Sequence, residues 1–301
     1  MYSQEEVDRL ANKLGVDSIL LSDLIKRRDS LYKIWYRKKS GGKKRCVEEP
    51  LGNLKIVQRI MLEKLFDLKF PKCVQGGIIG KSIRTNALEH KNGKYLLRMD
   101  IKDAYPSSTK KQLYALFRGF EVSVELSKIL TKLTTFHGHL PQGAPTSLVL
   151  FNALLGNTGI DRAASMIKDI KYTRYVDDLV FTSKKRIPEK LEKEAGVFLK
   201  EHGFSINPKK TLRYSTKNRS LRITGVNIID GKPKVPPKMI KKFRGMIGRA
   251  TTVDGSVSKE QIFGIIAFVI GIERKIPNQL LKPLLRYLKT KNVKDCPFVI
   301  S

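Results

Sequence analysis

The stretch KYTRYVDDLVFTS, residues 171–183, decides how this chain folds. Two largely apolar, alternating runs flank the pair Asp177 and Asp178, a pattern typical of a β-hairpin. Neighbouring side chains of a regular strand point to opposite faces, but a tight turn breaks that alternation. We therefore expect both carboxylates near one point at the end of a hairpin. The alternative is an ordinary surface hairpin, since Asp favours turns, so the motif alone is weak evidence.

A third acid, Asp100, stands where the apolar run KYLLRMDI (94–101) ends. Clustered carboxylates repel one another and lose solvation, so strands that bring them to a common edge need a reason. Bound Mg²⁺ supplies one, because it takes carboxylate oxygens and completes its shell with water and substrate phosphate. Two such ions are the known arrangement for in-line phosphoryl transfer. The sequence therefore predicts two Mg²⁺ ions, which Mn²⁺ can replace, at these three acids.

The overall charge points to a polyanionic partner. The chain carries 59 Lys+Arg against 28 Asp+Glu, a formal net charge of +31, which a compact fold tolerates poorly without such a partner. Nucleic acid is favoured over an anionic membrane surface, because no stretch approaches the roughly 18 apolar residues of a spanning helix. We expect no membrane partner. The N-terminus lacks a signal-peptide layout, and Cys46, Cys73 and Cys296 are isolated, so a reduced cytoplasmic location is expected.

The rest of the chain alternates helical and strand patterns. Ser3 with Glu6 predicts a capping box at a first helix, and Asp17 or Ser18 can begin a second. The run RKKSGGKKR (37–45) holds six basic residues in nine, and it is either a solvated loop or a basic hairpin that holds phosphates. Further helices are expected over 53–70, 109–119, 122–134, 146–168 and 187–202, a strand over 94–101, short strands near 204–206, 210–214 and 221–229, and helices alone after Pro237.

Four sequence blocks follow one another along the chain: MDIKDAYPSS (99–108), LPQGAPTSLVLFN (140–152), YVDD (175–178) and GFSINPKKT (203–211). In these blocks the chain resembles the reverse transcriptases over roughly residues 40 to 230. The resemblance implies an α+β, right-hand polymerase fold with fingers, a palm with an antiparallel sheet, and a small helical thumb. It implies N-terminal helices and fingers over 1–98 with the palm boundary near 94, a palm over 99–232 with fingers helices inserted near 109–139, and a basic, RNA-binding thumb over 233–301.

The resemblance also implies roles for single residues. Asp100, Asp177 and Asp178 would be catalytic metal ligands with the Ile101 carbonyl, and Lys209 or Lys210 would protonate pyrophosphate. Tyr105 would be the steric gate that rejects a ribose 2′-hydroxyl, although ordinary core packing is its alternative. Leu148 departs from many relatives, which have Pro there. The remaining nucleotide-binding residues would be Arg45 as the triphosphate clamp with Lys43 and Lys44 beside it, the backbone of Asp103 and Ala104, and Gln142 with Gly143.

Two shorter elements are similar to those of bacterial retron reverse transcriptases, namely NALEH (86–90) and ITGVNI (223–228), where Ile223 replaces Val. Local packing also explains Asn and His four residues apart on a helix. The retron resemblance implies a structured non-coding RNA from the same locus as template and primer, dNTP substrates, a branched RNA–DNA product, and a role in anti-phage defence through a separate effector. The RNA-binding candidates are Asn86, His90, Thr224, Gly225, Lys241, Lys242, Arg244 and Arg249.

Three alternatives stay open. One is a stand-alone group II intron-like or abortive-infection reverse transcriptase that uses another RNA or none. The second is a non-catalytic RNA-binding protein on a polymerase scaffold, although such a protein would need neither the three aspartates nor Tyr105. The third is a nucleotidyl cyclase or RNA-making palm enzyme, which a gate at Tyr105 disfavours.

Overall fold

The computed structural model describes residues 2–38, 42, 44–217, 219–252, 257–293 and 297–298. Part of the basic run 37–45, including Lys43, lies outside the described residues, as does Cys296. The chain divides into two compact units: residues 1–77, 97–181 and 187–212 form the first, and 78–96, 182–186 and 213–301 form the second. The three-part division into 1–98, 99–232 and 233–301 stays a prediction.

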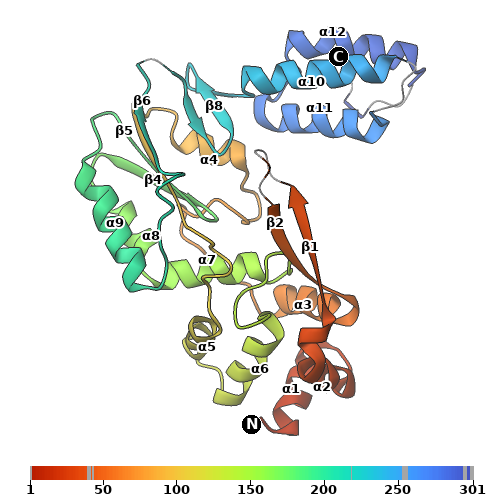
Figure 1. Cartoon of the computed structure of the whole chain (residues 1–301), viewed down its shortest axis with the longest axis vertical. Helices are drawn as coiled ribbons and strands as arrows, with labels where there is room; N and C mark the ends of the chain where they lie inside the picture. The colour runs from red at the N-terminus through yellow and green to blue at the C-terminus, as the bar shows by residue number, and fades with distance from the viewer. Residues whose placement is uncertain are drawn as a thin grey trace. The chain divides into compact units, whose positions relative to one another are not determined.

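The first unit begins with helices and a hairpin (Figure 1). The helices are α1 (Gln4–Leu14), α2 (Ser18–Arg27), a 3₁₀ turn (Arg28–Leu31) and α3 (Gly52–Lys64). Between them, β1 (Tyr32–Lys38) and β2 (Lys44–Pro50) pair antiparallel, with Arg37 opposite Arg45. The two strands that flank the basic run therefore form the predicted hairpin. The later helices of this unit are α5 (Lys110–Arg118), α6 (Val124–Thr134), α7 (Ser147–Asn157), α8 (Ile160–Ser165) and α9 (Glu189–Glu201).

A four-stranded sheet carries the three predicted catalytic acids. Its strands are β3 (Tyr95–Asp100), β4 (Ile170–Tyr175), β5 (Asp178–Ser183) and β6 (Leu212–Ser215), in the order β4-β5-β3-β6. The sheet therefore makes β3 and β5 neighbours although about 80 residues separate them in the sequence. Apolar side chains of β3, β5 and α7 are buried in the core around this sheet, among them Leu97, Met99, Leu150, Phe151, Leu155, Leu179 and Phe181.

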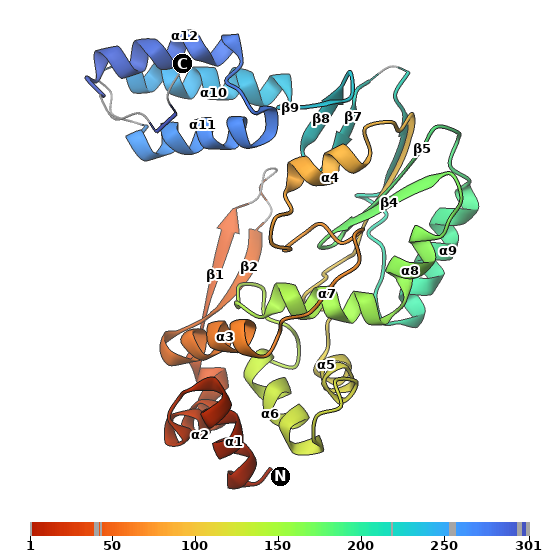
Figure 2. The same ribbon diagram turned by 180° about the vertical axis from the view of Figure 1, so that it is seen from behind.

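The second unit holds a small sheet and the C-terminal helices (Figure 2). Strands β7 (Leu221–Ile223), β8 (Val226–Ile229) and β9 (Lys232–Lys234) form an antiparallel meander, and α4 (Ile83–Glu89) packs on it. Three helices follow, α10 (Pro237–Thr251), α11 (Lys259–Glu273) and α12 (Asn278–Thr290). The helical C-terminal region expected after Pro237 is confirmed.

Three local predictions are wrong, each for an identifiable reason. The helix expected over 53–70 ends at Lys64, and it could not have continued through Phe70, because the residue before Pro71 disfavours the helical conformation. The long helix expected over 146–168 is two helices, broken at Gly159, whose φ of 85° is left-handed. The capping box at Ser3 is incomplete: the Glu6 N–H donates to Ser3 Oγ at 3.4 Å, but the Ser3 N–H donates to Glu125 Oε2 at 2.7 Å.

Among the helices that the structure describes, none is both long and apolar enough to cross a membrane.

Candidate active site

The three predicted catalytic acids converge at neighbouring strand ends. Asp100 is the last residue of β3 and Asp178 the first of β5, while Val176 and Asp177 form the turn between β4 and β5. Val176 has a φ of +60°, the left-handed conformation that breaks the alternation of side chains. The Ile101 N–H donates to the Asp177 carbonyl oxygen at 2.9 Å, which joins the turn to the end of β3. The expected hairpin with both acids at its turn is confirmed.

The electrostatics of this cluster are unfavourable for its own charges. Burial raises the pKa of Asp177, and the nearby charge of Asp100 raises it further. Burial and then the charge of Asp177 raise the pKa of Asp178 to about 6. Carboxyl groups respond in this way when they are desolvated together without enough compensating positive charge. The fold therefore maintains a concentration of negative charge that its own interactions do not neutralise.

One cation does reach the cluster. Lys210 places its Nζ 2.7 Å and 2.8 Å from the two carboxylate oxygens of Asp100. The turn that carries Lys210 is held in place because the Asn207 N–H donates to the Asp100 carbonyl oxygen at 2.8 Å. The Lys210 side chain stays 52% exposed, so it can also reach an incoming group. Of the two predicted lysines, Lys210 is thus the one in contact with a catalytic acid.

The donor set suits Mg²⁺. Carboxylates and a backbone carbonyl are hard oxygen ligands, which this ion prefers, and excess negative charge at one point is what a dication relieves. Within the described part of the chain, no group of three or more His, Cys, Asp or Glu side chains is arranged to hold a metal ion. The residues nevertheless fit the predicted ions in chemistry, and their role as ligands stays a prediction.

Tyr105 lies beside these acids. Burial raises its pKa to about 12, and the charge of Asp177 contributes to the increase. Its ring leans on Phe151, with 5.5 Å between the ring centroids and 40° between the planes. The preceding residues form a turn: Asp103 has a φ of +45°, and the Ala104 carbonyl accepts a hydrogen bond from Ser108 Oγ at 2.8 Å. Tyr105 is thus half-buried against the Phe151 ring. This position is compatible with both interpretations of Tyr105, core packing and the steric gate.

The predicted nucleotide-binding loop is bonded to the hairpin strand that carries Arg45. The Glu48 N–H donates to the Gln142 carbonyl at 3.0 Å, and the Gln142 N–H donates to Glu48 Oε2 at 3.3 Å. A side chain at Gly143 would lie 2.9 Å from Val47 Cγ1 and 3.0 Å from the Glu48 carbonyl oxygen, so only glycine permits this approach. Arg45 and Lys44 are exposed on the same strand. Glu48 therefore couples two predicted nucleotide-binding segments.

Sequence reasoning missed Glu48 and its partner His139. The His139 Nε2 atom lies 3.1 Å from both Glu48 carboxylate oxygens. Its hydrogen bond with Glu48 raises the pKa of His139. Nothing local marks this pair, since 90 residues separate the two partners along the chain. Only the packing of β2 against the loop after α6 brings them together.

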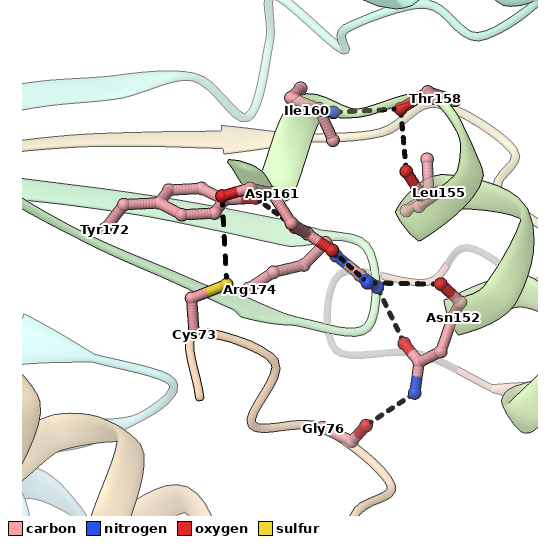
Figure 3. Close-up of polar contacts among 9 residues, drawn as sticks. All are labelled: Cys73, Gly76, Asn152, Leu155, Thr158, Ile160, Asp161, Tyr172 and Arg174. Carbon is pink, nitrogen blue, oxygen red and sulfur yellow. Dashed lines mark hydrogen bonds and ion pairs between the residues drawn. The ribbon is translucent and has the colours of Figure 1, made fainter. Parts of the chain in front are cut away.

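A buried ion-pair network beneath the catalytic turn was also missed (Figure 3). Arg174 is fully buried and donates to both carboxylate oxygens of Asp161, with Nε–Oδ1 at 2.9 Å and Nη2–Oδ2 at 2.7 Å. Its Nη1 donates to Asn152 Oδ1 at 2.6 Å, and Asn152 Nδ2 donates to the Gly76 carbonyl at 2.9 Å. An Arg in the strand that leads into the turn, three residues before Asp177, was the available sequence signal.

This network holds the segment beside the catalytic turn. The Arg174 N–H donates to the Cys73 carbonyl at 2.8 Å, and the Gln75 N–H donates to the Arg174 carbonyl at 2.8 Å. A side chain at Gly76 would lie 2.5 Å from the Val176 backbone nitrogen, so the two backbones touch. A side chain on the next residue, Gly77, would lie only 2.4 Å from the Leu148 side chain. The absence of a side chain at Gly77 therefore leaves the space that Leu148 occupies at the start of α7.

The two retron-like elements meet within the second unit. Asn86 Nδ2 lies 3.4 Å from Thr224 Oγ1, and His90 Nδ1 lies 2.7 Å from Thr182 Oγ1. Thr224 and Gly225 form the β7–β8 turn with positive φ values of 43° and 86°. Asn86 and His90 are buried, so their side chains serve packing in this structure, and direct RNA contact by them stays a prediction.

The predicted thumb residues lie on α10. All four are exposed, and Arg244 lines a cavity of about 740 Å³ together with Lys282 and Arg286 of α12. Lys241 and Arg244 also line a neighbouring cavity of about 440 Å³. Concave basic surfaces of this kind suit phosphate groups. The full set of predicted thumb contacts is Lys241, Lys242, Arg244 and Arg249.

Comparison with known proteins gives consistent matches. A family model described as "Reverse transcriptase (RNA-dependent DNA polymerase)" matches residues 36–228. The chain is 30% identical to the retron Mx162 reverse transcriptase of Myxococcus xanthus, over 79% of this chain and 57% of that relative. It is 27% identical to the retron Ec86 reverse transcriptase of Escherichia coli, over 90% of this chain and 85% of that relative. The chain thus spans little more than half of the first relative and most of the second.

Among solved structures, the chain is similar to telomerase from Candida albicans in complex with a fragment of telomeric RNA. The TM-score is 0.49 with 11% sequence identity, over 90% of this chain and 63% of that chain. The resemblance to retron reverse transcriptases that the short motifs predicted is confirmed by the sequence relatives.

Proposed function

Because this chain belongs to the reverse transcriptase (RNA-dependent DNA polymerase) family, we propose that it is an RNA-directed DNA polymerase. The observation that carries the proposal is the convergence of Asp100, Asp177 and Asp178 at one sheet edge with raised pKa values at Asp177 and Asp178. A fold gains nothing in stability from such a cluster, so its charges serve a ligand. The half-buried Tyr105 beside the cluster adds the group expected to select the sugar.

The proposed mechanism assigns each residue a task. Two Mg²⁺ ions, when held by the three aspartates and the Ile101 carbonyl, would supply activation of the primer hydroxyl and neutralisation of the leaving pyrophosphate. Arg45, with Lys44 beside it, binds the triphosphate of the incoming dNTP, because a guanidinium fork matches phosphate oxygens. The backbone N–H groups of Asp103 and Ala104 orient the same triphosphate.

The remaining site residues act on the sugar, the base and the leaving group. Tyr105 leaves no room for a 2′-hydroxyl, and the loop at Gln142 and Gly143 contacts the incoming nucleotide and the templating base. Lys210 gives a proton to the leaving pyrophosphate. Its ion pair with Asp100 holds the ammonium group within reach of the site.

The substrate is proposed to be a structured non-coding RNA encoded beside this gene. The similarity to retron Mx162 and Ec86 reverse transcriptases and the bonded Asn86–Thr224 pair support this choice. Synthesis would begin at a 2′-hydroxyl of that RNA and give a branched RNA–DNA hybrid. The exposed basic face of α10 would hold an RNA stem by its phosphates and shape. A defence role through a separate effector protein is part of the same proposal.

The test is to express the chain with its native flanking DNA and to look for a small single-stranded DNA attached to RNA. We expect that product with the wild type and none with Asp177→Asn. dNTP incorporation on a generic primed RNA without that product would retain the polymerase and reject the retron-type substrate. Absence of both activities would favour a binding protein on a polymerase scaffold.

A second assay addresses the sugar. Tyr105→Ala should incorporate ribonucleotides that the wild type rejects, whereas Tyr105→Phe, which keeps the ring, should not. Unchanged selectivity in Tyr105→Ala would show that Tyr105 only packs against Phe151. Ribonucleotide preference by the wild type would instead favour an RNA-making palm enzyme.

A further inference from the structure

A separate basic cavity lies in the first unit, between α5 and α6. Its volume is about 640 Å³, in the range of small-ligand pockets, and its lining includes Lys110, Lys111, Lys128, Lys132, Tyr2 and Tyr114. We call it the α5–α6 pocket. Figures 1 and 2 both draw α5 and α6 on the opposite side of α7 from β4. None of its lining residues belongs to the proposed active site.

The four lysines of the α5–α6 pocket are not neutralised by the protein. Across the residues that the structure describes, none of them lies within 4.0 Å of a carboxylate oxygen, whereas Lys55, Lys210 and Lys234 do pair in this way. The nearby Glu125 accepts two hydrogen bonds from Ser3, at 2.6 Å and 2.7 Å. Those bonds lower the pKa of Glu125 more than the charge of Lys128 does.

Two of these lysines stand where they weaken the fold. Lys110 and Lys111 occupy the first turn of α5, which contains no acidic residue. The helix N-terminus is already positive, so a cation there is unfavourable. Lys128 and Lys132 lie one turn apart on α6 and are half-buried, so two like charges are neighbours on one helix face. Stability does not account for four cations in this arrangement, and a bound polyanion does.

The aromatic residues narrow the class of polyanion. Tyr114 is half-buried at the pocket and makes no hydrogen bond or ring contact with the described part of the chain. Lys132 Nζ lies over the Tyr2 ring, 4.7 Å from its centroid. Lysines that track a phosphate backbone next to rings that can stack on bases form the usual surface for single-stranded nucleic acid. A duplex offers no unpaired base for stacking.

We propose that the α5–α6 pocket binds a single-stranded segment of RNA, with its phosphates on the four lysines and an unpaired base on Tyr114. The choice of RNA rests on the proposed function, because the RNA that this chain would copy is the ligand available to the pocket. The pocket gives such an RNA a second attachment point, separate from the one that presents its template bases to the aspartates.

The test measures binding of a fluorescent oligouridylate to the full chain without dNTPs, over a range of salt concentrations. The pocket variant Lys128→Gln/Lys132→Gln is compared with Lys193→Gln/Lys200→Gln, two exposed lysines of α9 that carry the same charge. Each lost phosphate contact lowers the slope of log affinity against log salt by about 0.7, so the pocket variant should lose about 1.4. The α9 variant should keep the wild-type slope and affinity.

A second readout locates the base. Oligouridylate containing 5-iodouridine should crosslink to Tyr114 in the wild type, and Tyr114→Leu should bind about fivefold more weakly with an unchanged salt slope. If Lys128→Gln/Lys132→Gln lowers the melting temperature, the exposed pair Lys110→Gln/Lys111→Gln replaces it. Equal losses in the pocket and α9 variants, or crosslinks that avoid Tyr114, would overturn the proposal.

Two other outcomes are informative. Loss of binding to phosphatidylserine vesicles in the pocket variant, with RNA binding unchanged, would assign the pocket to a membrane surface and refute the RNA proposal. Binding is measured without dNTPs, so it does not depend on polymerase activity. If the chain does not polymerise, the proposed function is refuted, and the binding measurement still tests RNA binding at the α5–α6 pocket.

Discussion

The first unit contains two acidic sites, the single Asp161 and the cluster of Asp100, Asp177 and Asp178, and the fold treats them in opposite ways. Asp161 is buried beside Arg174, which donates to both of its carboxylate oxygens through Nε and Nη2, and the Tyr172 hydroxyl also donates to it at 2.9 Å. Asp100, Asp177 and Asp178 share one sheet edge, where Lys210 is the only cation in direct contact among the residues that the structure describes, and burial with mutual repulsion raises the pKa of Asp177 and Asp178. The first group completes its own charge balance, whereas the second leaves its balance to a ligand.

The difference separates structural charge from functional charge. A buried ion pair that is fully hydrogen-bonded can be removed only at a large loss of stability, because each partner then stands alone in a low dielectric. A cluster of like charges is expected to behave in the reverse way, since the loss of one charge relieves repulsion. Substitutions in the two groups should therefore separate activity from folding.

The largest effect is expected at the unbalanced cluster. Asp177→Asn should reduce dNTP incorporation by on the order of a thousandfold or more, because a proposed metal ligand loses its charge. Its melting temperature without metal should equal or exceed that of the wild type. Primer extension and thermal denaturation of the same preparation measure the two quantities. Synthesis at a normal rate would refute the metal assignment.

The balanced pair should show the opposite profile. Arg174→Met should lower the free energy of unfolding by about 3–5 kcal/mol, because Asp161 is left buried and unpaired. The double variant Arg174→Met/Asp161→Leu should recover part of that loss, since no charge is then stranded. Denaturant unfolding of the single and double variants measures the coupling. Equal stabilities for Arg174→Met and the wild type would contradict this account.

His139 and Glu48 test the comparison by pH, because protonation switches their charge balance on and off. The hydrogen bond to Glu48 raises the pKa of His139 in the folded chain above its unfolded value. The pair's contribution is therefore complete below about pH 6.5 and is lost as pH rises through the folded pKa. His139→Gln should cost about 1 kcal/mol at pH 6 and less at pH 9. A loss that does not change with pH would assign the effect to packing.

The smallest effect is expected from one peripheral bond of the balanced group. Tyr172→Phe removes the hydroxyl that donates to Asp161 while Arg174 continues to hold that carboxylate. Unfolding free energy should fall by about 0.5–1 kcal/mol, and polymerisation should be unchanged. A loss as large as that of Arg174→Met would mean that the tyrosine, rather than the arginine, maintains the network.

Local signals were sufficient for the catalytic strands. An alternating run around Asp177 and Asp178, and an apolar run that ends at Asp100, specify two strands that terminate in acids, since side-chain period and turn chemistry act within a few residues. Caps were foreseeable for the same reason, as at Asp17, which accepts from the Leu20 N–H at 2.7 Å. The helix breaks at Lys64 and Gly159 depended on weaker local signals, and the periodicity over 53–70 and 146–168 concealed them.

The sequence by itself determined which residues carry the proposed chemistry and the family to which the chain belongs, because both are written in short motifs and their order. Only the tertiary structure decided which charges are balanced. The sheet order placed β5 beside β3, the packing of α8 on β4 gave Arg174 its partner, and the approach of β2 to the loop after α6 gave Glu48 its histidine. Such pairings depend on distances across the folded chain, which local sequence patterns do not encode.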